Sequence, residues 1–267
     1  MNGTVFDHLM AAHWLVLASI SNPNPMSKPL RDFLVEYYVY TATLSMVSID
    51  ARVSSQFLLG DEVQAHARNL TSNRYVGSLC GCWLELLLLI PNIFAIGRRF
   101  SAETEASRPV TADDFADFVD VQSRINSWSP LASVHPNVAL AGRVFQQAML
   151  IYLYTALQSL SSAANGRHES IIQSAVDEAL SILDELPPSA RVNTSLCWPI
   201  AVIGSCAGEE TQRIRLCSRL DIMFAGIGLG NIRQTRVLLD HLWRMDSPDP
   251  WKICRVMQEH QIWISFA

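Results

Sequence analysis

Two acidic segments carry the residue types and spacing that could hold a metal ion. The first is DDFAD, at residues 113–117, and the second is DEALSILDE, at residues 177–185. Carboxylate oxygens are the ligands that a hard cation such as Mg²⁺ takes in proteins. In the second segment the candidates follow one another at four-residue steps, which would place them on one face of a helix. The candidate ligands are Asp113, Asp114, Asp117, Asp177, Ser181 and Glu185.

This acidic pattern resembles that of the class I terpene synthases, an all-α family. Their Asp-Asp-x-x-Asp motif and a second motif of Asn or Asp, Ser or Thr, and Glu hold magnesium against a diphosphate. The resemblance implies one alternative function, a magnesium-dependent enzyme that acts on a prenyl diphosphate. It requires the two segments to face one cavity. The segments are closer together here than is usual in that family.

Both segments also fit ordinary surface helices. Thr111 precedes Asp113 and Asp114 and predicts a helix N-cap with an acidic first turn, where carboxylates meet free N–H groups and the positive end of the helix dipole. Asp177 lies opposite an apolar stripe that contains Ile172 and Val176, where a soluble helix places its polar residues. We favour this interpretation and assign no catalytic, cofactor-binding or metal-binding residue.

GIGLGN, at residues 226–231, invites a phosphate-binding interpretation that its surroundings do not support. A dinucleotide fingerprint follows a strand, whereas this segment lies between two helical patterns, RIRLCSRLDIMFA and IRQTRVLLDHLW. The sequence predicts a turn, in which Gly226 or Gly228 ends one helix in the left-handed conformation and Asn231 caps the next.

The remaining chemistry-bearing residues favour a structural role. The seven histidines are scattered without a catalytic spacing. The six cysteines contain no C-x-x-C pair and sit mostly among apolar residues, which indicates free thiols in a reducing compartment. The aromatic side chains that could line an apolar pocket are expected to pack in the core. They are Tyr37, Tyr38, Tyr40, Trp83, Tyr152 and Tyr154.

The sequence predicts that the elements that position these residues are all helices. The chain has 267 residues, about half of them hydrophobic, without repeats or low-complexity tracts. We expect an all-α fold, a single domain over residues 1–267 with about ten to twelve antiparallel helices. The expected helices cover residues 5–20, 28–49, 61–70, 76–98 with a kink at Pro91, 111–128, 137–163, 168–185, 197–207, 210–225, 231–245 and 250–264.

Charge and hydropathy exclude two classes of partner. The net charge is −5 and there are only two lysines, so the chain lacks the basic face of a nucleic-acid binder. Arginines gather in the last third, but acidic residues alternate with them, which favours a solvated, partly ion-paired surface. These arginines are Arg213, Arg215, Arg219, Arg233 and Arg236. The most apolar run, residues 83–97, is interrupted and too short to span a membrane.

One segment is more specific than the rest. SLCWPIAVIGSCAGEETQRIR, at residues 195–215, resembles the C-terminal domain of fungal-specific transcription factors with a Zn(2)-Cys(6) cluster, the second of its two common types. That pattern has Leu-x-Trp-Pro, then Gly with Cys and Ala, then Arg, a Gly-Asn pair and two tryptophans. The matching residues are Leu196, Trp198, Pro199, Gly204, Cys206, Ala207, Arg213, Gly230, Asn231, Trp243 and Trp251.

The resemblance implies an all-α regulatory module of a transcriptional regulator, located in the nucleus and without enzymatic activity. The cysteine cluster and basic linker of such regulators are missing from this sequence, so direct nucleic-acid binding is not carried over. The expected partners are the transcription machinery or a DNA-binding regulator. A small-molecule effector, a homodimer and control of a metabolic or secondary-metabolism gene set are further expectations. A stand-alone ligand-binding protein on the same fold is a third alternative.

Overall fold

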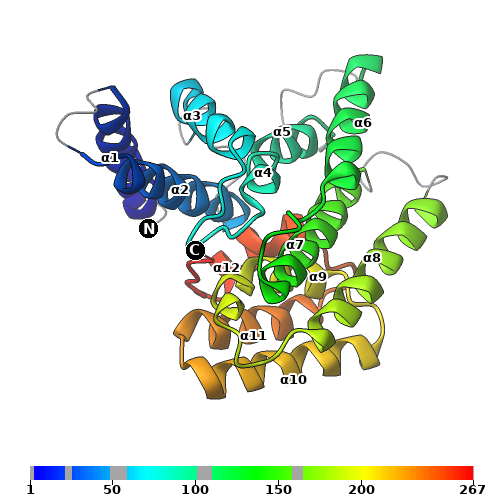
Figure 1. Cartoon of the computed structure of the whole chain (residues 1–267). Coiled ribbons are helices and arrows are strands. Elements are labelled where there is room, and N and C mark those ends of the chain that lie inside the picture. The colour runs from blue at the N-terminus through cyan, green and yellow to red at the C-terminus, as the bar shows by residue number, and fades with distance from the viewer. Residues whose placement is uncertain (1–2, 22–25, 49–58, 101–109, 158–164, 267) are drawn as a thin grey trace.

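The computed structural model describes residues 3–21, 26–48, 59–100, 110–157 and 165–266. These residues form helices and contain no strand, which confirms the all-α single domain (Figure 1). In chain order the α-helices and short 3-10 helices (η) are α1 (Gly3–Ser21), α2 (Lys28–Ser45), η1 (Met46–Ser48), α3 (Asp61–Ser72), α4 (Leu84–Leu87), α5 (Ile90–Phe100), α6 (Ala112–Ser127), α7 (Pro136–Thr155), α8 (Asn165–Glu185), η3 (Arg191–Ser195), α9 (Cys197–Ser205), α10 (Glu210–Ile227), α11 (Gly230–Leu242), η4 (Pro250–Lys252) and α12 (Ile253–Glu259).

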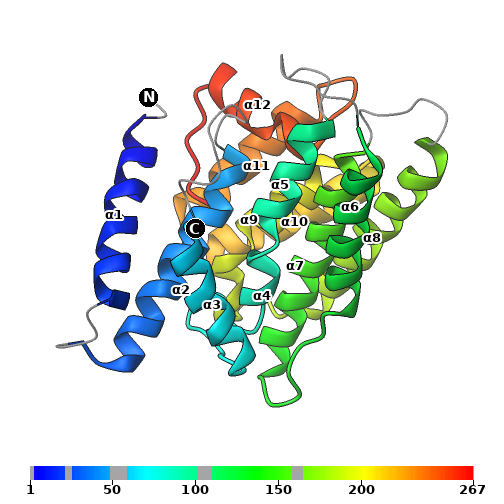
Figure 2. The same ribbon diagram turned by 90° about the horizontal axis from the view of Figure 1, so that it is seen from above.

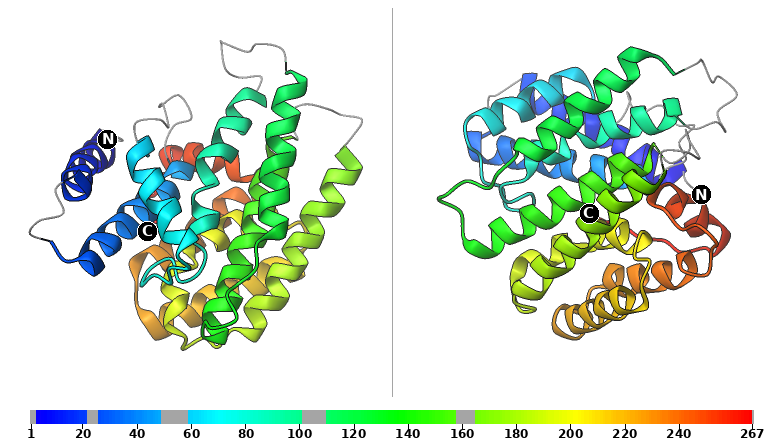
Figure 3. Two further views of the ribbon diagram at one scale, coloured as in Figure 1. Left: turned by 45° about the horizontal axis from the view of Figure 1, so that its top comes forward. Right: turned by 90° about the vertical axis from the view of Figure 1, so that its right-hand side faces the viewer.

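Helix α7 lies at the centre of the fold. It packs along α8 and also contacts α5, α6 and α9. Helices α1 to α3 lie on one side of it, and α9 to α11 lie on the other (Figure 3). Helix α1 stands at the outer edge, against α2 and α3 (Figure 2). Because α7 is apolar on most sides, burial of nearly its whole circumference is what its sequence predicts.

A single carboxylate fixes the loop that joins α3 to α4. Glu36 of α2 is fully buried. Its Oε1 accepts the backbone N–H groups of Leu79 at 2.6 Å and Cys80 at 2.7 Å. Its Oε2 accepts the Ser78 N–H at 3.1 Å and the Tyr75 hydroxyl at 2.8 Å. Four donors thus satisfy a buried carboxylate that would otherwise be costly to remove from water.

The same loop depends on two glycines. A Cβ at Gly77 would lie 2.0 Å from the Glu36 carboxylate, so a side chain there would displace it. Gly81 has φ of +48° and closes the loop by accepting the Gly77 N–H at 2.7 Å. Burial raises the pKa of Tyr75, and its hydrogen bond to Glu36 adds to the shift, so Tyr75 keeps the proton that it donates.

The helix expected over residues 76–98 is therefore a loop followed by two shorter helices. Residues 76–83 are not helical, because Glu36 takes the N–H groups that a helix would use internally. Pro91 lies in the first turn of α5, where its missing N–H costs nothing, and does not kink a longer helix. No helix among the described residues is long and apolar enough to cross a membrane.

Two further expectations are corrected at the ends of helices, and others lie on residues that the structure does not describe. The helix expected over 250–264 ends at Glu259, and an extended tail buries Ile262 and Phe266. Asn231 does not cap α11, since the extended residue at its N-cap is Leu229. Residue 49 and residues 158–163, expected in helices, lie outside the described residues.

The turn predicted at GIGLGN is confirmed. Gly228 ends α10 with φ of +75°, and its N–H donates to the Phe224 carbonyl at 2.8 Å. An added Cβ at Gly226 or Gly228 would meet no atom within 4 Å. Gly228 therefore serves the left-handed helix end, and the segment forms no phosphate-binding strand–turn–helix unit.

Replacing Glu36 by Gln should destabilise the fold without changing its shape. The amide NH₂ cannot accept N–H donors, so at least one buried N–H loses its partner, at a cost of about 2–4 kcal/mol. Urea unfolding followed by circular dichroism measures the change. The exposed Glu178→Gln variant is the control, expected within about 0.5 kcal/mol of the wild type. Equal stability of the two variants would contradict the role given to Glu36.

Candidate functional site

The DDFAD segment forms the first turn of α6. Thr111 is the N-cap, and its backbone N–H and hydroxyl both lie 2.9 Å from Oδ2 of Asp114. Asp114 is only 1% exposed, whereas Asp113 faces solvent. The predicted cap with an acidic first turn is therefore confirmed, and Asp114 serves the helix itself.

Arg99 of α5 neutralises two of these carboxylates. Its Nη1 lies 3.3 Å from Oδ1 of Asp114, and its Nη2 lies 2.9 Å from Oδ2 of Asp117. The guanidinium thus joins the end of α5 to the start of α6. A protein cation occupies the place that a metal ion would take in the enzyme alternative.

The second acidic segment lies elsewhere on the surface. Asp177, Ser181 and Glu185 are exposed on α8. Oδ1 of Asp177 accepts the side-chain amide of Gln212, on α10, at 2.8 Å. The two segments thus contact different helices, α5 and α10. In the part of the chain that the structure describes, no group of three or more His, Cys, Asp or Glu residues could hold a metal ion.

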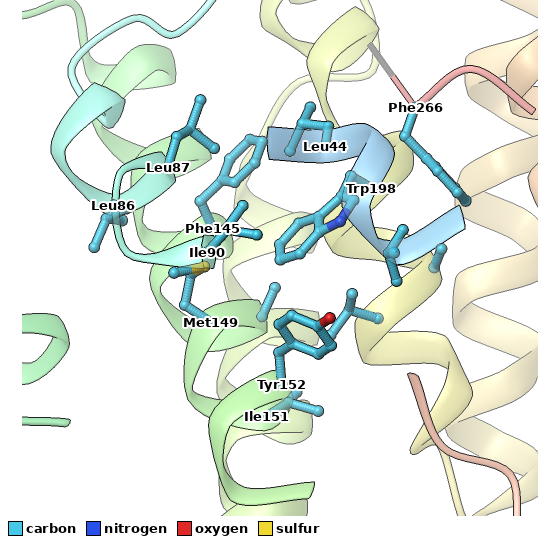
Figure 4. Packing of buried hydrophobic residues seen from close by; sticks show 14 of the residues in the cluster. Leu44, Leu86, Leu87, Ile90, Phe145, Met149, Ile151, Tyr152, Trp198 and Phe266 are labelled. Atoms are coloured by element: carbon cyan, nitrogen blue, oxygen red, sulfur yellow. The ribbon is translucent and has the colours of Figure 1, made fainter. Parts of the chain in front are cut away.

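The Trp-Pro segment builds the core between α7 and α9. Trp198 is fully buried and stacks on Phe145, with ring centroids 6.0 Å apart (Figure 4). The Tyr152 ring meets it edge-on at 6.0 Å. Trp83 covers the other side of Phe145 at 5.0 Å. Of the six aromatic residues assigned to the core, only Tyr37 is exposed, at 54%.

The glycine and arginine of the same pattern join α9 to α10 and α11. A Cβ at Gly204 would lie 2.7 Å from the Leu239 side chain, so the two helices meet there. The Trp243 indole donates to the Gly204 carbonyl at 2.8 Å. Arg213 donates to the Ala207 carbonyl at 3.0 Å, and its guanidinium lies 5.5 Å from the centre of the Trp243 ring.

The last tryptophan of the pattern reaches α5. Trp251 stacks on Tyr152 at 4.5 Å and on Phe94 at 6.1 Å. Its indole N–H donates to the Thr155 hydroxyl at 3.2 Å. A Cβ at Gly97 would lie 2.1 Å from the Trp251 ring, so the α5 backbone touches the indole directly.

Most of the residues that carried the sequence resemblance therefore contribute to the packing around α9, namely Trp198, Gly204, Ala207, Arg213, Trp243 and Trp251. A family model described as the fungal specific transcription factor domain matches residues 6–267. The chain belongs to this family. No curated protein and no solved structure matches it. Family membership supports a role in transcription regulation, and the motif residues act as packing and capping groups within that domain.

The arginines of the last third are partly ion-paired, as expected, and among the described residues two of the five contact carboxylates. Arg215 lies 2.5 Å from Asp184, and Arg236 contacts both Asp221 and Asp240. Arg219 is an exception, because it is buried rather than solvated. Its guanidinium donates to the carbonyls of Leu183 and Leu186, at the end of α8. Burial lowers the pKa of Arg219.

The cysteines are free thiols with structural surroundings. Burial raises the pKa of Cys197 to about 11 and that of Cys206 to about 12, and it raises that of Cys80 well above its usual value. Thiols so far from ionisation at neutral pH are poor nucleophiles and poor metal ligands.

A cleft between α3, α5 and α6 is the strongest candidate for a ligand site. Its volume is about 530 Å³, within the usual range for small-molecule sites. Its partly exposed apolar residues are Pro91 and Ala95. Its ionisable groups are Asp61, Arg99, Asp117 and Asp120. It opens to solvent, unlike the enclosed apolar pocket that the ligand-carrier alternative predicts.

Of the ionisable residues in the cleft, only Asp117 was a candidate from the sequence. Asp61, Arg99 and Asp120 come from three helices that sequence spacing does not connect. The Arg-Arg pair at the end of an apolar helix was the one available signal, since a cation that ends such a helix needs anionic partners.

Two glycine substitutions should separate tight packing from open space. Gly97→Ala places a methyl group against the Trp251 ring and should cost about 1–3 kcal/mol. Gly226→Ala, in an exposed helical turn, meets no atom and should stabilise by about 0.5–1 kcal/mol. Thermal unfolding of both variants measures the signs. A stable Gly97→Ala variant would show that α5 does not rest on Trp251.

Proposed function

We propose that the whole chain, residues 1–267, acts as one regulatory domain of a transcriptional regulator. The supporting observation is the family match over residues 6–267, together with the packing of the motif residues into one core. The domain works in the nucleus and by binding rather than by catalysis. The enzyme alternative is not carried forward, because its two acidic segments contact different helices.

DNA recognition in this proposal comes from a partner or from another part of the regulator. The net charge of −5 and the pairing of the arginines with carboxylates support this division. A duplex is gripped by a basic face that neutralises its phosphates. Control of a metabolic or biosynthetic gene set belongs to the same proposal. It would be read from the transcripts that change when the gene is deleted.

The solvent face of α10 supports binding to protein partners. Ile214 and Ile222 are 55% and 51% exposed and lie two helical turns apart, opposite the buried Leu216 and Leu220. A soluble helix normally places polar residues on this face. In this proposal the two isoleucines belong to the contact surface for the transcription machinery, a DNA-binding regulator or a second copy of the chain.

Tethering tests the regulatory role. Fused to an unrelated DNA-binding module, the chain should change the output of a reporter gene about threefold or more, because partner contacts at micromolar affinity suffice for recruitment. The DNA-binding module alone is the reference. Output equal to that of the module alone, with the fusion folded and present in the nucleus, would contradict the proposal.

The α10 face should carry this effect. The double variant Ile214→Glu, Ile222→Glu should return reporter output toward that of the module alone, because a buried unpaired charge costs an interface about 2 kcal/mol or more. Val119→Glu, at a 58% exposed position on α6, is the matched control and should retain the effect. Equal outputs of the two variants would place the contact surface elsewhere.

A further inference from the structure

We propose that the cleft between α3, α5 and α6 binds a small organic cation with an apolar body, which acts as the effector of the domain. The role as an effector rests on the proposed regulatory function, whereas the binding site is inferred from the geometry of the cleft alone. Four observations support it: the volume of the cleft, its apolar lining, its excess of carboxylates over cations, and the lack of three convergent metal ligands among the described residues.

The cleft has both the room and the lining for a ligand with an apolar part. Its volume of about 530 Å³ exceeds that of a single ring system. Pro91 and Ala95, both partly exposed, contribute carbon surface to its wall, whereas Leu59, Ile96 and Val121 are at most 3% exposed. Burying such surface against a ring or a short aliphatic chain is favourable by about 25 cal/mol per Å². A purely hydrated ion would not use this wall.

The charges of the cleft select a cation. The cleft is lined by three carboxylates, those of Asp61, Asp117 and Asp120, and by one guanidinium, that of Arg99. Arg99 is already shared between Asp114 and Asp117. The nearest cationic partner of Asp120 is Arg124, at 3.9 Å in an exposed contact, and Asp61 has no ion pair among the described residues. Within the described part of the chain Asp61 thus has no ion pair and Asp120 only a long one, which leaves a net negative charge for a positively charged ligand.

The arrangement favours an organic cation over a metal ion. Within the described ranges no three metal-ligating side chains are close enough to share a metal ion. A guanidinium, amidinium or ammonium group needs no such convergence, because it donates hydrogen bonds in several directions. Its apolar body would lie against Pro91 and Ala95.

Three aromatic ligands of one shape and different charge test this inference. Benzamidine is cationic, benzamide is neutral and benzoate is anionic, and each is titrated into the full chain by calorimetry or NMR. We expect benzamidine to bind about tenfold more tightly than benzamide, and benzoate not to bind below about 10 mM. Equal affinity for benzamidine and benzamide, or no benzamidine binding below about 10 mM, would overturn the proposal.

Variants locate the binding. Asp120→Asn and Asp61→Asn should each weaken benzamidine binding about two- to fivefold, the effect of one exposed charge contact. Glu178→Gln removes an exposed carboxylate on α8 and should leave the affinity unchanged. If all three variants bind alike, the ligand lies outside the cleft and the proposal fails. A basic octapeptide that binds at Asp120 when benzamidine does not would assign the cleft to a protein partner instead.

The outcome is separable from that of the tethering test. Benzamidine binding at Asp120 combined with an inactive reporter fusion would support the cation site and remove the regulatory function. An active fusion without benzamidine binding would remove the cation site and leave the regulatory function in place.

Discussion

The fold depends on the burial of one carboxylate at a point where four donors meet it. Glu36 is fixed by α2, and the N–H groups that it accepts belong to a loop about forty residues later in the chain. Because Glu36 accepts the N–H groups of this loop, the loop keeps an irregular conformation that its own backbone hydrogen bonds would not maintain. That path ends at Trp83, which the loop sets against Phe145 of the central helix. A local charge thereby determines where the aromatic core begins.

From Phe145 the core continues through rings that come from distant parts of the sequence. Trp198 stacks on Phe145, Tyr152 meets Trp198, and Trp251 stacks on Tyr152. Each ring adds a large apolar surface and also fixes an angle, because indole and phenyl faces pack in few orientations. The residues that identify the family are thus those whose geometry is hardest to replace, and they need no catalytic role to explain their chemistry.

Local signals in the sequence predicted the helices well where the cause was local. Thr111 with its acidic turn and Gly228 after α10 act on their own neighbours, and both predictions are confirmed. The prediction over residues 76–98 was wrong because the competing partner, Glu36, is remote in sequence. The prediction that Asn231 caps α11 was wrong because the helix begins at Gly230, with Leu229 as its N-cap. The cleft was beyond prediction, since three helices contribute to it without a shared motif.

Helix α5 joins the cleft to the aromatic core. Arg99 lines the cleft and Gly97 touches Trp251, and two residues along a helix differ in direction by about 200°. One side of α5 therefore faces the proposed cation site and the opposite side rests on the core. A ligand that binds more tightly when α5 is displaced would alter the contact between Gly97 and Trp251. Coupling free energies between two sites are typically about 1–3 kcal/mol, and close-packed rings leave little free volume in which a displacement of α5 could be absorbed.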